Sequence, residues 1–373
     1  MLKTICRIPF LIPVVVLSFA TLGFANEHDK IRQPILTPQN SGTTQLLDTV
    51  SVVNSRVVWA AGFGGTYLLT TDGGTTWKAA VVPGAEELQF RDVQGFSDKV
   101  AYLQSVGSSP TDFRIYKTVD GGAAWTMQFQ NQNPYAFYDG FAFWSPKGGI
   151  AHSDSVNGVF PDLRTTDGKT WQDISSNMPP ALVGEFSFAA GGTCIATQGE
   201  RNAWIATGGS FVARILATRD GGDTWNAYDT PLLSSPSAGA FTVAFRDPWN
   251  GIVGGGDLDP SDPNHAATAT SDDGGKTWTL TNYPPVTGAI YNLSYVRRIG
   301  RGQDEERDDD YSHTVVVAAL TSAAWTPDEG ETWYSLPGVT GYISVAFASP
   351  DAGWMVGLNG TILKISFRHE ESH

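Results

Sequence analysis

The sequence predicts an all-β fold, a single seven-bladed β-propeller of four-stranded blades. Three observations carry this prediction: a turn motif recurs six times, its spacing is nearly constant, and each interval holds enough short apolar runs for four strands. The chain has 373 residues, with 41 glycines and 21 prolines. This length and this supply of turn residues suit one large all-β domain or two small ones, and composition alone does not separate these two cases.

The repeated motif has the form Thr/Ser-x-Asp-Gly-Gly-x-Thr-Trp. Its aspartate can accept hydrogen bonds from N–H groups of its own turn, its glycines allow positive φ, and its tryptophan can pack on the next strand. The third copy lacks one turn residue, and the second has Ala124 where threonine is usual. The tryptophans follow one another at 46 to 55 residues. The structural pairs are Asp72 and Trp77, Asp120 and Trp125, Asp167 and Trp171, Asp220 and Trp225, Asp273 and Trp278, and Asp328 and Trp333.

A second pattern surrounds these turns: an apolar strand, a polar turn, and a short strand that closes on glycine, as in residues 243–254 and 345–357. Each interval therefore holds three strands before the turn motif and one after it. The innermost strand of each blade faces a central channel. We expect these inner strands near residues 47–53, 88–93, 138–144, 185–190, 240–246, 291–297 and 342–348.

The seventh repeat ends near Phe367 without a turn motif or an outer strand. We expect the missing strand to come from residues 32–37, which would close the ring and leave no long sheet edge exposed. A six-bladed ring with a loose C-terminal hairpin is the alternative. The expected organisation is a signal peptide (1–25), an N-terminal segment that supplies the closing strand (26–45), the propeller (46–367) and a tail (368–373).

Residues 1–25 have the pattern of a cleavable signal peptide. Lys3 and Arg7 precede an apolar stretch that runs to Phe24, and polar residues follow Ala25. The stretch is short and interrupted by prolines, so cleavage near Ala25 is favoured over an uncleaved membrane anchor. The pattern predicts a secreted or periplasmic protein with no stable membrane span after cleavage. Cys194 is then the remaining cysteine, and we expect a buried strand thiol.

The net charge and the motifs of the sequence limit the classes of partner and cofactor that the protein could bind. The formal net charge is −14 at pH 7, and removal of residues 1–25 takes away two cations and no acid, which argues against nucleic acid as a partner. The sequence has no Cys-x-x-Cys pair and no nucleotide-binding glycine fingerprint, and His152, His265 and His313 lie in separate repeats. We expect no cofactor, no metal site and a monomer.

The six turn motifs resemble the bacterial-neuraminidase repeat, also known as the Asp-box or BNR repeat. Together with the Gly-Trp-x-x-Gly strand at 353–357, they resemble the propellers of the photosystem II stability and assembly-factor family over nearly all of residues 45–367. Runs such as 90–92 and 139–144 also resemble exported bacterial proteins often labelled "oxidoreductase", although no redox motif is found. The resemblance implies the fold, whereas Asp-box propellers range from glycosidases to non-enzymatic assembly factors. The first hypothesis it implies is a non-catalytic exported propeller that binds a protein or peptide.

Function in propellers usually sits where the inner strands begin, at the mouth of the channel. We expect the residues placed there to bind the partner. They are Glu87, Tyr138, Asp139, Glu185, Tyr291, Asn292 and Tyr342.

The second hypothesis is a glycoside hydrolase or lyase of the sialidase-like type that acts on an acidic or complex glycan. Asp139 and Glu185 from neighbouring blades would form its carboxylate pair, and Arg91 or Arg246 would bind the acidic sugar. The arginine signature of sialidases occurs here only as Arg7-Ile8-Pro9, inside the predicted signal peptide. If the protein is an enzyme, we expect a glycosidase rather than an oxidoreductase.

The alternative to this hypothesis is that the same residues have structural roles. Asp139 and Glu185 would then cap the starts of strands or form hydrogen bonds to loops. We place Arg91 and Arg246 at equivalent positions late in the inner strands of repeats two and five. There they would pair with Asp92, Asp247 and neighbouring residues and fasten adjacent blades.

Overall fold

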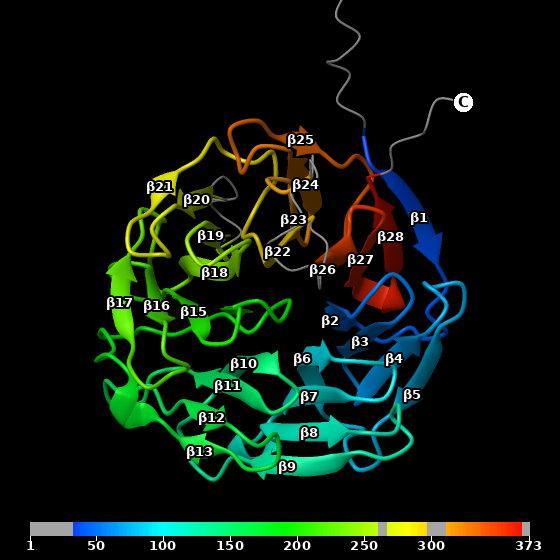
Figure 1. Ribbon diagram of the computed structural model, residues 1–373, viewed down its shortest axis with the longest axis horizontal. Coiled ribbons are helices and arrows are strands. Elements are labelled where there is room, and N and C mark those ends of the chain that lie inside the picture. The colour runs from blue at the N-terminus through cyan, green and yellow to red at the C-terminus, as the bar shows by residue number, and fades with distance from the viewer. Residues whose placement is uncertain (1–32, 260–266, 297–310, 368–373) are drawn as a thin grey trace, which may run out of the picture. The chain divides into compact units, whose positions relative to one another are not determined.

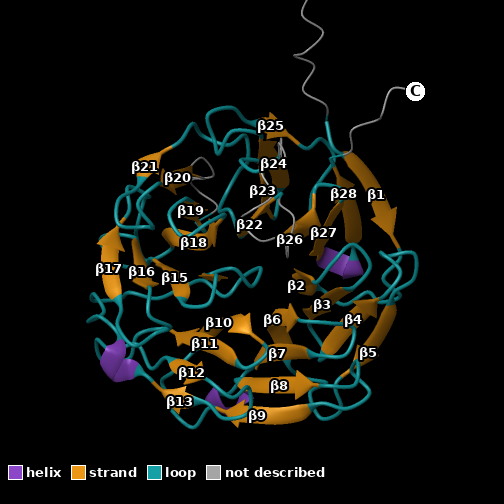
Figure 2. Ribbon diagram, viewed as in Figure 1, coloured by secondary structure: helices purple, strands orange, loops and turns teal. Residues whose placement is uncertain are grey.

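Seven antiparallel four-stranded sheets form the blades of a ring in the computed structural model, which describes residues 33–259, 267–296 and 311–367 (Figure 1). All elements described here belong to the unit Pro34–His373. Figure 2 shows that strands make up nearly all of its regular structure and that helices are limited to short turns. The predicted all-β seven-bladed propeller is confirmed, and the six-bladed alternative is wrong. The predicted signal peptide and tail lie outside the described residues.

The first four blades follow the chain in order, each from its inner to its outer strand. Blade one contains β2 (Leu47–Val52), β3 (Val58–Gly62), β4 (Thr66–Thr70) and β5 (Lys78–Val81). Blade two contains β6 (Gln89–Gly95), β7 (Ala101–Val106), β8 (Arg114–Thr118) and β9 (Thr126–Gln130). Blade three contains β10 (Tyr138–Ser145), β11 (Gly148–Ser153), β12 (Leu163–Thr165) and β13 (Gln172–Asp173). Blade four contains β14 (Ile195–Gln198), β15 (Asn202–Thr207), β16 (Arg214–Thr218) and β17 (Asn226–Asp229).

The remaining blades complete the ring. Blade five contains β18 (Ala238–Phe245), β19 (Gly251–Asp257), β20 (Ala267–Ser271) and β21 (Thr279–Leu280). Blade six contains β22 (Asn292–Tyr295), β23 (Val315–Ala319), β24 (Ser322–Thr326) and β25 (Tyr334–Ser335). Blade seven contains β26 (Tyr342–Ser349), β27 (Ala352–Gly357), β28 (Ile362–Ser366) and β1 (Ile35–Gln39). Short 3₁₀ turns are η2 (Pro110–Asp112), η3 (Ser175–Asn177) and η4 (Leu358–Gly360).

The inner strands agree with the prediction in six blades and differ in blade four. There the inner strand is Ile195–Gln198, so the prediction of 185–190 is wrong. Most other inner strands share an irregularity near their start, a single bulged residue without a partner on the second strand. The bulged residues are Asp48, Arg91, Asp139, Phe241 and Ile343.

The ring is closed by the N-terminal strand, as predicted. β1 pairs antiparallel with β28 from Ile35 opposite Ser366 to Gln39 opposite Ile362. The Oε1 atom of Gln39 accepts hydrogen bonds from the indole N–H groups of Trp354 in blade seven (3.1 Å) and Trp77 in blade one (3.0 Å). One side chain on the closing strand therefore joins the last blade to the first.

Each Asp-box is a self-capped turn, as its residues predict. The Asp72 carboxylate accepts the hydroxyl (2.6 Å) and N–H (2.9 Å) of Thr76, and the Thr70 hydroxyl accepts the Gly74 N–H (2.9 Å). These hydrogen bonds, led by those from Thr76, lower the pKa of Asp72 to about 2. In the second box, Ala124 supplies only its N–H. The Asp72 carboxylate thus fixes the turn through Thr70 and Thr76, and the Thr70 hydroxyl in turn holds the second glycine.

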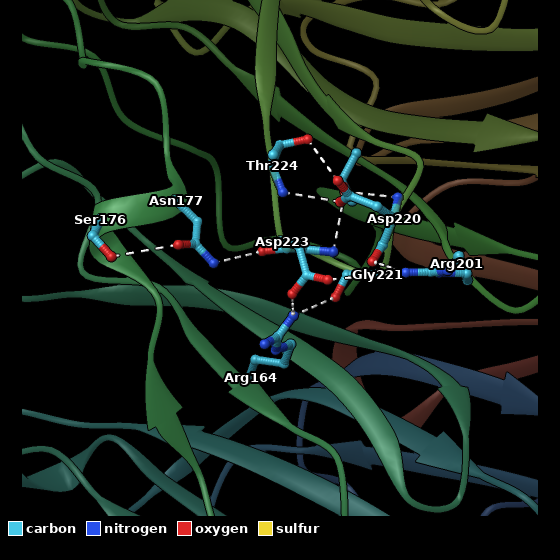
Figure 3. A network of polar contacts seen from close by, with 10 residues as sticks. Arg164, Ser176, Asn177, Arg201, Asp220, Gly221, Asp223 and Thr224 are labelled. Atoms are coloured by element: carbon cyan, nitrogen blue, oxygen red, sulfur yellow. Dashed lines mark hydrogen bonds and ion pairs between the residues drawn. The ribbon is translucent and has the colours of Figure 1, made fainter.

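The boxes also join the blades. In each box the carbonyl of a glycine accepts a hydrogen bond from the preceding blade, as Figure 3 shows for Arg164 and the box of blade four. Asn177 adds a bond to Gly222 O (2.9 Å) and Arg164 an ion pair with Asp223 (2.6 Å) at this junction. The donor and acceptor pairs are Lys364 and Gly73 (3.3 Å), Tyr67 and Gly122 (2.7 Å), Tyr102 and Gly168 (3.0 Å), Arg164 and Gly221 (3.0 Å), Trp204 and Gly274 (2.8 Å), and the N–H of Asn282 and Gly330 (3.0 Å).

The box tryptophan of blade four tests this arrangement. Trp225 is buried in a core cluster with Ile174 and Leu216, so Trp225→Ala should lower the free energy of unfolding by about 3–5 kcal/mol, measured by urea denaturation. Trp249→Ala is the matched control, because Trp249 is 54% exposed and its loss should change stability by no more than about 0.5 kcal/mol. An unchanged midpoint for Trp225→Ala would refute the packing role of the box.

Candidate functional site

The ring has two distinct faces. All inner strands begin on one face, where loops join the second strand to the third and one blade to the next; we term it the loop face. The Asp-boxes join the third strand to the fourth, so they lie on the opposite face, the box face. Toward the box face the channel holds a cavity of about 480 Å³. Its walls include Ser51, Gln94, Phe143, Thr197, Phe245, Tyr295 and Phe347, one from each blade.

The loop-face end of the channel is filled by residues 188–193, which we term the plug. Phe186 pairs with Gly208, and the Cys194 carbonyl accepts the Ala206 N–H (2.8 Å), so the plug leaves the inner edge of blade four between these points. It stands where other blades have one bulged residue. In Figure 1 this green segment reaches the middle of the ring. The insertion explains why the inner strand of blade four starts later than predicted.

Blades on the far side of the channel bind the plug. The Gly191 carbonyl accepts hydrogen bonds from Asn292 Nδ2 (2.7 Å) and Ser344 Oγ (3.0 Å). The hydroxyls of Thr193 and Thr242 lie 2.7 Å apart. These contacts connect the plug to blades five, six and seven.

The plug sequence requires glycine at its tip. Gly191 and Gly192 have φ angles of 73° and 70°, where residues with a Cβ are strained. A Cβ on Gly192 would lie 2.7 Å from both Asp92 Oδ1 and Thr49 Oγ1. The Gly-Gly pair therefore lets the backbone approach the inner strands of blades one and two.

Buried carboxyl groups surround the plug. Asp92 accepts the Phe141 N–H (3.0 Å), which links blades two and three, and Asp139 hydrogen-bonds to Asp154. Burial raises the pKa of Asp92 and of Asp139 well above the ordinary range. Burial also raises the pKa of Asp48 to about 6, although Arg91 opposes this shift. Burial therefore shifts all three groups toward the protonated form, and Asp92 and Asp139 act as hydrogen-bonding parts of the core.

Asp139 and Glu185 each have another partner. Glu185 is buried and binds the Arg214 guanidinium (Nε–Oε1 2.8 Å), the Thr207 hydroxyl (2.7 Å) and the Leu182 N–H (2.7 Å). Asp139 is buried and bonded to Asp154 of its own blade. The structure therefore does not pair these two carboxylates across an open channel mouth.

The two candidate arginines lie at opposite ends of the channel. Arg91 is the bulged residue near the start of β6, whereas Arg246 follows the end of β18, so their predicted equivalence is wrong. Arg246 pairs with Asp247 (2.9 Å) as predicted, and with Glu329 in the box of blade six (2.8 Å). Arg91 was predicted to pair with Asp92, but its guanidinium instead lies 3.6 Å from the carboxylate of Asp48. Among the residues that the structure describes, the two arginines therefore do not share one site.

The other residues predicted to lie at the channel mouth differ in how far they are exposed to solvent. Tyr138 is buried and stacks on Phe113 (centroids 4.0 Å apart), and Asn292 is buried under the plug. Tyr291 and Tyr342 are half-buried, and Glu87 is exposed on the loop face. Burial raises the pKa of both half-buried tyrosines.

Sequence reasoning missed an apolar surface on the loop face. Val183 and Phe211 are 94% and 79% exposed. Hydrogen bonds connect their loops, from Ser210 Oγ to Val183 O (2.9 Å) and from Ser234 Oγ to Ser210 O (2.8 Å). The loop-face apolar surface consists of Tyr135, Phe137, Val159, Val183, Phe211 and Leu233. It extends over blades three to five, and no periodic pattern in the sequence marks it.

The charge of the loop face is acidic. Its described loops contain no lysine. Arg91, Arg114 and Arg214 lie near its strand ends, and each is ion-paired with a carboxylate. Glu86 and Glu87 are exposed there. The loop face therefore combines exposed apolar side chains with negative charge.

Metal ligands do not gather among the residues that the structure describes: no group of three or more His, Cys, Asp or Glu could hold an ion there. His152 is buried, and its Nδ1 lies within hydrogen-bonding distance (2.9 Å) of both carboxylate oxygens of Asp162 in the same blade. Cys194 is a buried free thiol whose pKa is raised by burial. His265 lies outside the described residues. In the described part of the chain, no helix is long and apolar enough to span a membrane.

Fold and motif define the class of this protein: it is an Asp-box β-propeller. Residues 269–280, the box of blade five and its flanks, match the family model described as BNR/Asp-box repeat. A comparison with curated protein sequences gives no match.

Solved propellers are similar to the chain at the level of fold. One is YCF48 bound to D1 peptide, with 16% identity, a TM-score of 0.61, and coverage of 91% of this chain and 96% of that chain. YCF48 from Cyanidioschyzon merolae has 15% identity and a TM-score of 0.61 over 89% of this chain and 98% of that chain. The WD40 β-propeller domain of Doa1 has 12% identity and a TM-score of 0.57 over 90% and 98%. The likeness to photosystem II assembly-factor propellers is thus shown as a likeness of fold.

The buried acids predict an unusual pH dependence. Because the folded-state pKa of Asp48 lies at about 6, above the ordinary 3.8, its stabilising effect is complete below about pH 4 and is lost as the pH rises through about 6. Asp48→Asn stays neutral, so at pH 7 its free energy of unfolding should exceed that of the wild type by about 2–3 kcal/mol. Its stability should also vary less between pH 4.5 and 7 in urea titrations.

Asp98, whose side chain is 46% exposed, provides the control, and Asp98→Asn should change the free energy of unfolding at pH 7 by no more than about 0.5 kcal/mol. An Asp48→Asn profile parallel to that of the wild type would show that Asp48 does not titrate in this range.

Proposed function

We propose that this protein is a non-catalytic propeller that binds a protein or peptide partner on its loop face. The observation that carries the proposal is the loop-face apolar surface, where large side chains of blades three to five stand exposed on hydrogen-bonded loops. Contiguous exposed apolar side chains on a soluble protein are typical of interaction sites. Loops on a rigid scaffold are also where binding residues concentrate.

The channel supports binding better than catalysis. Glycoside hydrolysis needs two carboxyl groups that flank the substrate bond, and both must reach it. Asp139 and Glu185 are buried and bound to Asp154 and Arg214, and the plug fills the end of the channel beside them. The geometry therefore favours the first hypothesis over the glycosidase.

A neighbour of the same fold adds support. YCF48 has been solved with D1 peptide bound, so a propeller of this architecture can carry a peptide. At 16% identity the likeness extends only to the fold, so the chemistry of the partner has to be inferred from the surface of this chain. The pattern of residues 1–25, outside the described range, further supports a partner in the periplasm or outside the cell.

The test compares three immobilised proteins: the wild type, the double variant Val183→Ser/Phe211→Ser, and Trp249→Ser, which changes an exposed aromatic on the box face. An envelope extract is passed over each, and bound proteins are quantified by mass spectrometry. We expect a partner captured by the wild type and the Trp249 variant, and at least about tenfold less by the double variant, because loss of buried apolar contacts weakens binding by about that factor. All three should melt at similar temperatures.

Equal capture by the double variant would contradict a loop-face site. Turnover of any glycan in a broad panel, lost in Asp139→Asn, would contradict the non-catalytic assignment.

A further inference from the structure

We infer that the groove between residues 107–113 and 134–137 holds one large apolar or aromatic side chain of a basic partner segment. This inference rests on the proposed function and specifies the chemistry of the partner. The groove is a cavity of about 230 Å³ on the loop face, at the junction of blades two and three. Its walls include Pro110, Phe113, Pro134, Tyr135 and Phe137. Small-molecule sites usually measure about 300–1,000 Å³, so this groove suits a single side chain.

The walls of the groove are held in place by buried hydrogen bonds. The Nδ2 atom of Asn131 donates to the carbonyls of Pro110 (3.2 Å), Asn133 (2.8 Å) and Ala136 (3.3 Å), so one buried amide ties both walls together. On the first wall, Ser109 and Asp112 form a capping box around η2, with the Ser109 N–H donating to Asp112 Oδ2 (2.9 Å). A preformed groove loses little conformational entropy on binding.

The base and rim of the groove are aromatic. Phe113 at the base stacks on Tyr138, with ring centroids 4.0 Å apart and planes at 16°. At the rim, Tyr135 is 78% exposed and Phe137 is 42% exposed. The Tyr135 backbone is fixed by the Asn133 side chain (3.0 Å), so the ring is presented from an ordered turn. Aromatic side chains around a preformed pocket are typical of the centre of a binding site.

The charge around the groove indicates which kind of partner segment can bind there. The groove lining contains no charged residue, and the nearby Arg114 lies 3.5 Å from Asp112, which offsets its charge. Beyond the groove, the loop face exposes Glu86 and Glu87 and no lysine in its described loops. An acidic segment would be repelled, and a second copy would present the same acidic face. A segment with lysine or arginine beside an aromatic or large apolar residue is complementary to both features.

Three short fluorescein-labelled peptides test the inference by fluorescence anisotropy. The first has a central tryptophan flanked by lysines and glycines, the second has alanine in place of the tryptophan, and the third has glutamates in place of the lysines. They are titrated with the wild type, with Tyr135→Ala/Phe137→Ala, and with Trp249→Ala as an exposed-aromatic control on the box face. We expect the first peptide to bind the wild type and the control equally, and the groove variant and the other two peptides to bind at least about tenfold more weakly.

Several outcomes would overturn the inference. They are no binding of the first peptide to the wild type, equal binding to the groove variant, or equal binding of the glutamate peptide. If Val183→Ser/Phe211→Ser abolishes partner capture while Tyr135→Ala/Phe137→Ala leaves it intact, the groove assignment fails and the proposed function stands. A dimer in sedimentation equilibrium that is lost in Tyr135→Ala/Phe137→Ala would replace the peptide by a second copy. Matching melting temperatures verify that the variants fold.

Discussion

The hydrogen bond from each blade to a glycine carbonyl in the next Asp-box is the interaction on which this ring depends. The box aspartate fixes the turn through charge-assisted bonds, and the turn directs the glycine carbonyl toward the neighbouring blade. Six junctions use this acceptor, although the donors differ: lysine, tyrosine, arginine, tryptophan or a backbone N–H. Blade seven has no box, so the junction of blades six and seven lacks this acceptor. At the junction of blades seven and one, Gln39 on the N-terminal strand accepts hydrogen bonds from two tryptophans in addition to the box bond.

This construction separates structure from binding. The boxes and their inter-blade bonds occupy one face, and they leave the loops of the other face free to carry side chains that the core does not need. Exposed Phe211 and Val183 lie on those loops, whereas the large aromatics that hold the blades together, such as Trp59 and Trp354, are fully buried. The plug has a structural role as well, because it closes the loop-face end of the channel with its backbone, which Asn292 and Ser344 hold in place through hydrogen bonds.

The sequence predicted the boxes, the seven blades and the closing strand because each rests on local chemistry that repeats or on a strand missing from a repeat. It failed at blade four, where Phe186 and Phe188 resemble an inner strand but the chain leaves the sheet between Ser187 and Cys194. Asp139 does lie near the start of an inner strand, and Glu185 lies just before the Phe186 bridge of blade four. Their partners, Asp154 after β11 and Arg214 in β16, could not be predicted from spacing. Exposure of Tyr135 or Val183 likewise depends on the packed ring and has no sequence signal.

The central claim is that the box face builds the ring and the loop face binds. Hydrogen–deuterium exchange with and without the lysine–tryptophan peptide tests it most directly. The account predicts slower exchange in residues 131–137 and 107–113 and unchanged exchange in the box turns, for example 271–278. Slower exchange centred on the box turns, with the loop face unaffected, would contradict it.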